Sequence, residues 1–302
     1  VRWRSSPAPA VFAAATALVY GLKQQKDRKA DALFWERRAR ALLDRLGRPP
    51  REEARLELTL ANAFFAGQSF EDARDTARRA IAALEVAQPP DTVALGDAYN
   101  VLANTEAKTI EEAYDFYRTA VEAGERSLGP TFFREKKGHF WGMLETRPYM
   151  RARQGLAECL WDLGREEEAI AHYEALLELN PNANQGIRDV LLGCYVKRGN
   201  DAGAWHLYKQ YGGDGTAFFA WTRVLVEFRC GNLNASAKAL RAALKQNPHV
   251  LGFLSGREKL PRHLPDHYSL GGENEAIIYM SLFAEAWLAT PGVLAWLLGQ
   301  IE

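Results

Sequence analysis

A glycine returns at nearly equal intervals in the second half of this chain. Gly164 is followed by Gly199 after 35 residues and by Gly231 after a further 32. Each glycine ends a stretch whose apolar residues recur with helical spacing, and a second such stretch follows it. In residues 151–181, for example, Leu156 and Leu160 lie on one face of the first stretch. The pattern predicts pairs of antiparallel helices, one pair per period.

Small residues return with the same period. Ala169 is matched by Ala204 and Ala237, and Tyr173 is matched by Tyr208. An alanine where two helices cross lets them approach closely, while one helix pair is too thin to bury both of its faces and must stack on a neighbour. A period near 34 residues with these features is the tetratricopeptide pattern. We therefore predict an all-α fold, a tetratricopeptide-type superhelix of helical hairpins (an α-solenoid) with capping helices at both ends.

The pattern covers nearly the whole chain, which predicts a single helical-repeat domain over residues 1–302. The hairpins before residue 128 keep the period less faithfully than those after residue 147. The expected parts are a basic, Ala-rich N-terminal arm (1–29), an N-terminal helix with hairpins (30–127), an aromatic and basic insertion (128–147), the best-defined repeats (148–248) and a C-terminal cap (249–302).

The insertion separates two hairpins by more than twenty residues, whereas helix–helix connections usually have about 2–8. It concentrates aromatic and basic side chains, which leaves two interpretations. The segment is either a binding loop with aromatic anchors and a basic rim, or an insertion whose aromatics pack over the repeat junction. We favour packing, with Thr146 capping the next helix and Pro148 in its first turn. The candidate binding residues of the loop are Phe133, Arg134, Lys136, Lys137, His139 and Trp141.

The three cysteines follow the repeat as well. Cys159, Cys194 and Cys230 are 35 and 36 residues apart. An odd number at wide spacing fits neither a disulfide framework nor a zinc site. We expect them at equivalent points of successive first helices, as small buried side chains in a protein of a reducing compartment.

Several segments resemble a known family. They are GHFWGMLETRPYMRARQGLAECLWDLGREEEAIAHY (138–173), NPNANQGIR (180–188) and NPHVLGFLSGREKLP with GGENEAIIYMSLFAEAW (247–287). These segments are similar to the suppressor of tumorigenicity seven proteins of animals and their bacterial and algal relatives. The hydrophobic membrane segments of the animal members are missing here. The resemblance implies a helical-repeat scaffold without assigned catalysis, and it carries no functional residues over.

The first residues are basic and rich in Ala and Ser, and the first acidic residue is Asp27. Arg2 and Arg4 with Ser5 and Ser6 give this segment the composition of an organellar presequence, which indicates a mitochondrial protein. The alternative is an Ala-rich helix at the start of a cytoplasmic protein. Because the chain has no run of 18 apolar residues, we expect no membrane-spanning helix.

Motifs that carry chemistry are missing from the sequence. It has no phosphate-binding loop and no H-E-x-x-H pair, and Pro265 interrupts the spacing of His263 and His267. The run Glu166–Glu168 stands at a helix start, where acidic residues favour the helix dipole. We therefore predict no catalytic residue, no cofactor and no metal site, and we expect that the protein is not an enzyme.

The remaining class is a scaffold that binds other protein subunits, with an organellar complex as the expected setting. A cytosolic peptide-binding adaptor and an RNA-contacting repeat protein are the alternatives. Lys plus Arg and Asp plus Glu both number 38, and this balance argues against a polyanion-binding surface while leaving a local basic patch open. Gln154 and Glu158 stand where some tetratricopeptide grooves carry Lys and Asn for a terminal carboxylate, so that clamp is not supported.

We expect the binding groove to consist of the outward residues of the first helices. Trp161 and Trp221 are the predicted anchors, because aromatic side chains carry much of the energy of interfaces. Packing between repeats is the competing interpretation for both. The predicted groove residues are Arg151, Gln154, Glu158, Trp161, Asp162, Arg188, Tyr195, Trp221 and Arg229.

Overall fold

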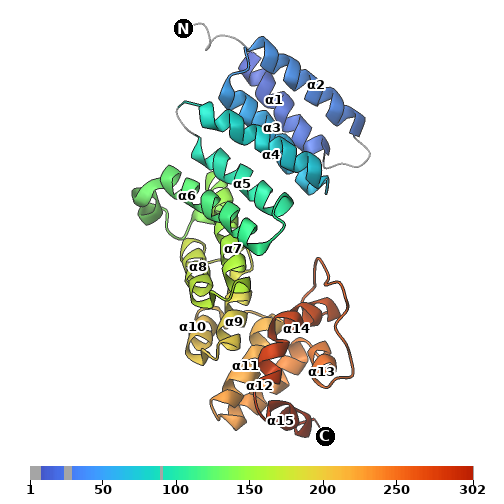
Figure 1. The fold of residues 1–302 in the computed structure, drawn as a ribbon. Coiled ribbons are helices and arrows are strands. Elements are labelled where there is room, and N and C mark those ends of the chain that lie inside the picture. The colour runs from blue at the N-terminus through green and yellow to red at the C-terminus, as the bar shows by residue number, and fades with distance from the viewer. Residues whose placement is uncertain (1–7, 24–28, 89–90, 302) are drawn as a thin grey trace. The chain divides into compact units, whose positions relative to one another are not determined.

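The computed structural model describes residues 8–23, 29–88 and 91–301. Within these ranges the regular elements are helices, without a β-strand, so the predicted all-α helical-repeat fold is confirmed (Figure 1). The contacts divide the chain into two compact units, Val1–Asn182 (unit 1) and Ala183–Glu302 (unit 2), where the sequence predicts one domain. The repeat pattern continues past residue 182, so the period alone gives no sign of this division.

Unit 1 consists of eight α-helices and two short 3-10 turns among its described residues. Three successive pairs, α3 with α4, α5 with α6, and α7 with α8, form the predicted hairpins. The elements are α1 (Ala8–Lys23), α2 (Lys29–Arg45), α3 (Pro50–Ala66), α4 (Phe70–Val86), α5 (Thr92–Thr105), α6 (Ile110–Glu135), η3 (Phe140–Gly142), η4 (Leu144–Thr146), α7 (Arg147–Asp162) and α8 (Glu166–Leu179).

The Ala-rich arm forms helix α1 and belongs to the core of unit 1. Phe12 and Val19 pack with Leu43 of α2 and with Leu56 and Leu60 of α3, and all five are almost fully buried. The arm therefore lies on helices of its own chain. The remaining residues on which the presequence interpretation depends lie outside the described part of the chain: Arg2, Arg4, Ser5, Ser6, Lys26 and Asp27.

The small residues lie where helices cross, as the period predicts. Ala169 and Ala204 are buried and Ala237 is half-buried. Gly164, Gly199 and Gly231 end the first helices with φ between 67 and 76°, a left-handed conformation that glycine adopts without strain. The recurring glycine is thus the residue that turns each first helix back towards its partner.

The insertion is more helical than the sequence predicts. Helix α6 continues to Glu135 across a break at Gly129, whose φ of 69° and ψ of 160° are not helical. Beyond it, Phe133 lies with its ring centroid 5.1 Å from Phe140 and 5.1 Å from Tyr149. Phe140 is fully buried, so packing is the correct interpretation for this aromatic cluster.

The predicted cap at Thr146 is wrong. Its hydroxyl forms no capping hydrogen bond to α7 and instead donates to the carbonyls of Phe140 and Met143. Thr146 is buried under the aromatic cluster, where these two carbonyls are the acceptors within its reach. Pro148 lies in the first turn of α7, as predicted.

Unit 2 has seven helices among its described residues. Helix α14 packs on α9 and α11. Its Tyr279, Phe283 and Trp287 are fully buried. The ring centroid of Phe218, on α11, lies 6.2 Å from that of Phe283. The ring centroid of Trp221, also on α11, lies 6.3 Å from that of Trp287. The elements are α9 (Ile187–Lys197), α10 (Asp201–Tyr211), α11 (Ala217–Arg229), α12 (Leu233–Gln246), α13 (His249–Leu254), α14 (Glu273–Leu288) and α15 (Val293–Gly299).

Two of the three cysteines lie as expected. Cys159 and Cys194 are buried, and burial raises the pKa of the Cys159 thiol to about 11, so that it stays protonated. Cys230 is exposed, which corrects the prediction. It is the residue directly after α11, in the turn made by Gly231, and so it lies beyond the buried face of its helix.

Unit 2 also buries acidic groups. Glu275 is fully buried and accepts hydrogen bonds from the amides of Ala217 and Gly271 and from the side chain of Asn247. Burial raises the pKa of Asp189, on α9, to about 7; Asp214 and Glu275 add to the shift, while Arg188 opposes it. Because an unfolded aspartic acid titrates near 3.8, the folded chain holds this proton over a pH range where the unfolded chain has lost it.

This difference predicts that Asp189 makes the fold less stable as the pH rises from about 4 to about 7. Between these values the folded state binds one more proton than the unfolded state, and the loss is about 1.4 kcal/mol per pH unit at its steepest. Asp189→Asn keeps the size of the protonated carboxyl and removes the titration. Urea unfolding of both chains at pH 4.5 to 7.5 measures the difference. A wild-type stability that does not fall relative to Asp189→Asn contradicts the prediction.

Candidate binding groove of unit 1

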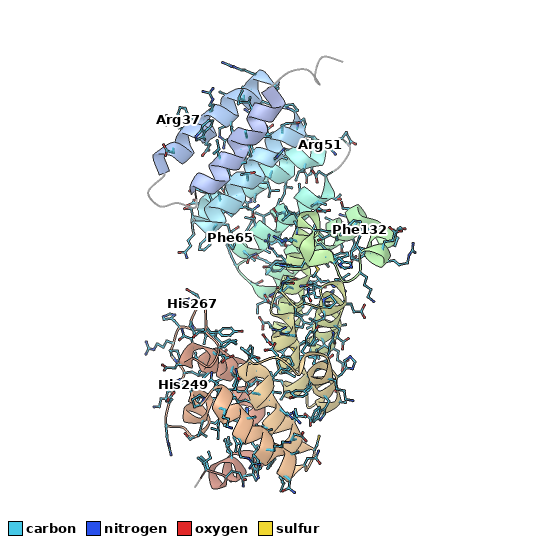
Figure 2. All side chains as sticks on the ribbon, turned by 180° about the vertical axis from the view of Figure 1, so that it is seen from behind. Arg37, Arg51, Phe65, Phe132, His249 and His267 are labelled. Atoms are coloured by element: carbon cyan, nitrogen blue, oxygen red, sulfur yellow. The ribbon has the colours of Figure 1, made fainter. Side chains whose placement is uncertain are left out.

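Two adjoining hollows lie along the first helices of unit 1. The first has a volume of about 640 Å³ and the second about 430 Å³. Asn62 of α3, Asp97 of α5 and Arg151 of α7 line both, so the hollows form one groove across three successive repeats. Figure 2 labels Arg51 and Phe65 at opposite ends of α3; Arg51 lines the first hollow and Phe65 the second.

The shared lining residues come from different points along their helices, since Asn62 lies near the end of α3 whereas Asp97 and Arg151 lie in the first halves of α5 and α7. The side-chain amide of Asn62 donates to Oδ2 of Asp97 over 2.9 Å. Arg151 follows after a longer interval because the insertion lies between α5 and α7. The row formed by Phe65, Asn100 and Gln154 lies three positions further along each helix. Repetition thus places side chains from distant segments in rows.

The first hollow has charges of both signs. The basic residues Arg51, Arg55 and Arg151 line it together with the acidic residues Glu52 and Asp97. Asp91 also lines it, but its carboxylate accepts the amide of Ala94 and so caps α5. Neither sign dominates the first hollow.

The second hollow has a surplus of hydrogen-bond acceptors. Desolvation raises the pKa of Asp97, although the hydrogen bond from Asn62 and the charge of Arg151 oppose the shift. Desolvation likewise raises the pKa of Glu158, which lies at the rim, and the charge of Asp162 adds to it. Asp97 is half-buried and Glu158 is exposed at the rim, so the acidic lining of this hollow extends from its interior to the solvent.

Asn100 lines the second hollow, and only the NH2 group of its side-chain amide forms a hydrogen bond. Its side chain donates to the carbonyl of Pro148 over 2.8 Å, which fixes its orientation. Its Oδ1 accepts no hydrogen bond, although Asn100 is only 7% exposed. A buried acceptor without a partner is costly, so Asn100 is suited to a ligand that brings a donor.

An aromatic side chain also lines this hollow. The ring of Tyr117, from α6, lies against Gly155 of α7, and burial raises the pKa of its hydroxyl to about 12. A Cβ built on Gly155 would overlap this ring. Glycine is thus the residue that lets α6 and α7 approach with Tyr117 between them.

The α7 part of the predicted groove lies where the sequence placed it. Arg151, Gln154 and Glu158 line the second hollow. Trp161 is half-buried and Asp162 is exposed at the end of α7, and neither lines either hollow.

The predicted groove residues of unit 2 are corrected by the structure. Trp221 is fully buried and donates to the carbonyl of Asn247, and Tyr195 is buried as well. Arg229 donates to the carbonyls of Val196 and Ala286 and so holds helices together. The period alone does not show that α14 covers these faces of α9 and α11.

Arg188, also predicted for the groove, forms an ion pair of 2.6 Å with Asp214 within unit 2. Of the insertion residues, Arg134, Lys136 and His139 are exposed, and Lys137 pairs with Glu178 over 2.7 Å. Trp141 is half-buried beneath the guanidinium of Arg147. These residues line neither hollow of the groove.

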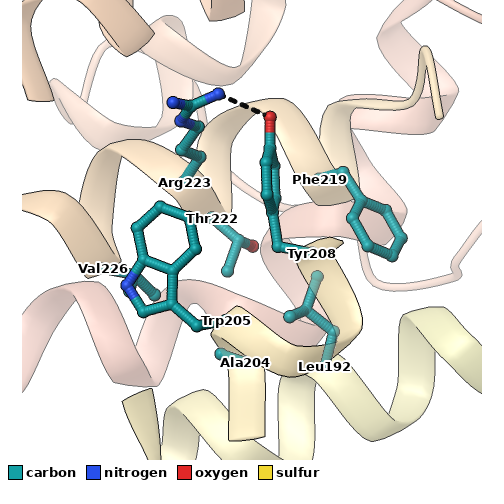
Figure 3. Close-up of a pocket in the computed structure, with 8 residues that line it drawn as sticks. All are labelled: Leu192, Ala204, Trp205, Tyr208, Phe219, Thr222, Arg223 and Val226. Carbon is teal, nitrogen blue, oxygen red and sulfur yellow. Dashed lines mark hydrogen bonds between the residues drawn. The ribbon is translucent and has the colours of Figure 1, made fainter. Parts of the chain in front are cut away.

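Unit 2 has a small pocket between α10 and α11, shown in Figure 3. Its volume is about 10 Å³, the space of a single water molecule. Arg223 donates to the hydroxyl of Tyr208 over 2.7 Å and lies over the rings of Tyr208 and Trp205. The guanidinium of Arg223 therefore takes the place over these rings that a cationic ligand would otherwise occupy.

Comparison with known proteins agrees with the repeat architecture. The family model described as "Tetratricopeptide repeat" matches residues 151–183, which contain most of α7 and all of α8. This segment is a tetratricopeptide repeat. Its first helix supplies Arg151, Gln154 and Glu158 to the groove, so the tetratricopeptide repeat forms one wall of the second hollow.

Two solved structures are similar to this chain to different degrees. The structure of Pseudomonas aeruginosa pilF is 17% identical to this chain, with a TM-score of 0.54, and the match covers 80% of this chain and 93% of pilF. BtubC (BKLC) from P. vanneervenii is 14% identical, with a TM-score of 0.48, and the match covers 88% of this chain and 99% of BtubC. The likeness to pilF supports the helical-repeat fold.

The described residues contain neither a single helix that could span a membrane nor a cluster that could hold a metal ion. None of their single helices is long and apolar enough to cross a membrane; α14 and α15 together reach that length but are bent by 111°. No group of three or more His, Cys, Asp or Glu side chains in the described ranges is placed to hold a metal ion.

The close approach at Gly155 predicts the effect of a single methyl group. Gly155→Ala forces a Cβ against the ring of Tyr117 and should destabilise the chain by about 1–3 kcal/mol. Gly21→Ala is the matched control, because Gly21 is also helical and a Cβ there meets no atom within 4 Å; it should leave the stability unchanged or raise it by up to about 1 kcal/mol. Urea unfolding measures both. Equal effects of the two variants would show that Tyr117 does not fill the space beside α7.

Proposed function

We propose that the protein is a non-catalytic scaffold that binds another protein, and that the groove of unit 1 holds an extended segment of that partner. The observation that carries the proposal is the groove itself, to which three successive first helices contribute side chains. The tetratricopeptide repeat at residues 151–183 supports it, because stacked helical repeats form extended concave binding surfaces.

The lining of the groove suits an extended polypeptide. Asn62, Asn104 and Gln154 are amides, and the hydroxyl of Tyr117 lies among them. The main chain of an extended segment presents a donor and an acceptor at each residue, and side-chain amides match both. Rows of polar side chains along a groove can therefore hold a main chain, while the hollows select side chains.

We further propose that the chain is a fixed subunit of a larger organellar assembly, in a mitochondrion. The basic, acid-free composition of its first residues supports the location, and the resemblance to the suppressor of tumorigenicity seven family supports a scaffold. A cytosolic adaptor is the alternative. An RNA-contacting groove is disfavoured, because Asp97 and Glu158 would face the phosphates.

Affinity purification from native extract tests the proposed function. The baits are the full chain, Arg151→Glu in the groove, and Arg126→Glu as a matched control on the exposed surface of α6. We expect chains that co-purify with the wild type and the control and are at least tenfold depleted with Arg151→Glu, because about 1.4 kcal/mol of lost binding energy lowers the affinity tenfold.

Recovery of the same chains with Arg151→Glu would contradict binding through the groove. Dilution during washing separates the two settings. A partner that stays bound after extensive dilution indicates a fixed subunit, whereas one that is lost within minutes indicates an adaptor.

A further inference from the structure

The second hollow of the groove collects acceptors from two helices without matching donors. Asn100 of α5 has its buried Oδ1 free, and among the described residues no hydrogen bond reaches Oδ1 of Asp97 or Oε2 of Glu158. Two side-chain amides that line the hollow are already engaged. Gln154 donates to Oε1 of Glu158 over 2.9 Å, and Asn104 donates to the carbonyl of Asn100 over 2.7 Å.

The charged side chains that line this hollow carry more negative than positive charge. Two carboxylates line it, and the cation among its lining residues is Arg151. Arg151 is exposed and forms no ion pair within the described residues, and its charge leaves the pKa of Asp97 above the usual value. The nearby carboxylate of Asp162 adds further negative charge at the rim.

Aromatic side chains complete the hollow. Phe65 of α3 and Tyr117 of α6 both line it. The face of an aromatic ring attracts a cation, and the attraction grows when water is displaced. An anionic ligand would meet two carboxylates and a bare carbonyl oxygen here, whereas a cationic ligand would supply the missing donors and charge.

We propose that the second hollow receives the lysine or arginine side chain of the extended partner segment, with Asp97, Asn100 and Glu158 as its acceptors. This inference rests on the proposed function and assigns the side-chain chemistry that one position of the partner must have. Asn100 is a specificity residue in this arrangement, because the bond to Pro148 fixes its amide while the oxygen remains without a partner. A neutral or acidic side chain at the same position would leave this buried oxygen unpaired.

A display library of random twelve-residue peptides, selected on the full chain, tests the proposal. Binders are first sorted by whether Arg151→Glu changes their affinity in either direction, which identifies peptides in the groove. We expect such peptides to exist and to share one position that is enriched in Lys or Arg. Groove-dependent peptides that lack this enrichment, or that are enriched in Asp or Glu, overturn the inference while the proposed function stands. If no selected peptide depends on the groove, both fail.

Matched variants then test the pairing itself on one selected peptide. Asp97→Asn and Glu158→Gln keep the shapes of the side chains, and each should weaken binding at least tenfold, as expected when a hydrogen bond to a charged group is lost. Glu122→Gln, on the exposed surface of α6, is the control and should bind as the wild type does. Circular dichroism and thermal unfolding establish that each variant is folded.

The same peptide with norleucine in place of the basic residue closes the cycle. We expect it to bind the wild type at least tenfold more weakly, and to bind the wild type and Glu158→Gln equally. If Glu158→Gln weakens the norleucine peptide as much as the original, the carboxylate acts on another part of the ligand, and the assignment of the hollow is wrong.

Discussion

The architecture depends on how closely two helices can approach. Where α3 packs on α4, the small residues Ala61, Ala73 and Ala77 are fully buried in one cluster. Val101 and Leu102 of α5 then fill the space beside that crossing, which ties one hairpin to the next. Each hairpin on its own would leave an apolar face in water, so the stack is a requirement of the hydrophobic effect.

Stacking in turn creates the groove. Because each hairpin packs on its neighbour, the first helices of successive repeats lie side by side. Asn62, Asp97 and Arg151 line the same groove for this reason, although insertions and turns separate them along the chain. The chemistry of the groove can therefore vary residue by residue while the scaffold that presents it stays fixed.

Periodicity predicted the helices, the glycine turns and the groove face of α7, since these depend on local spacing. It did not predict the burial of residues that are covered by a helix distant in the sequence. Trp221 and Tyr195 are on first helices of unit 2, yet both are buried, and α14 packs on those helices. The contributions of α3 and α5 to the groove were missed, because the hairpins before residue 128 keep the period less faithfully. The unused oxygen of Asn100 could not be predicted, because it depends on a contact with Pro148, 48 residues away.

The break at Gly129 lets the chain leave the stack and return to it. The residues between Gly129 and Arg147 form their own aromatic cluster, and α7 still packs on α5 and α6 as the next repeat. The thickness of a helix pair, and not the length of the connecting chain, therefore sets the distance between positions of the groove. A change in the number of residues between Gly129 and Arg147 would leave this spacing unchanged.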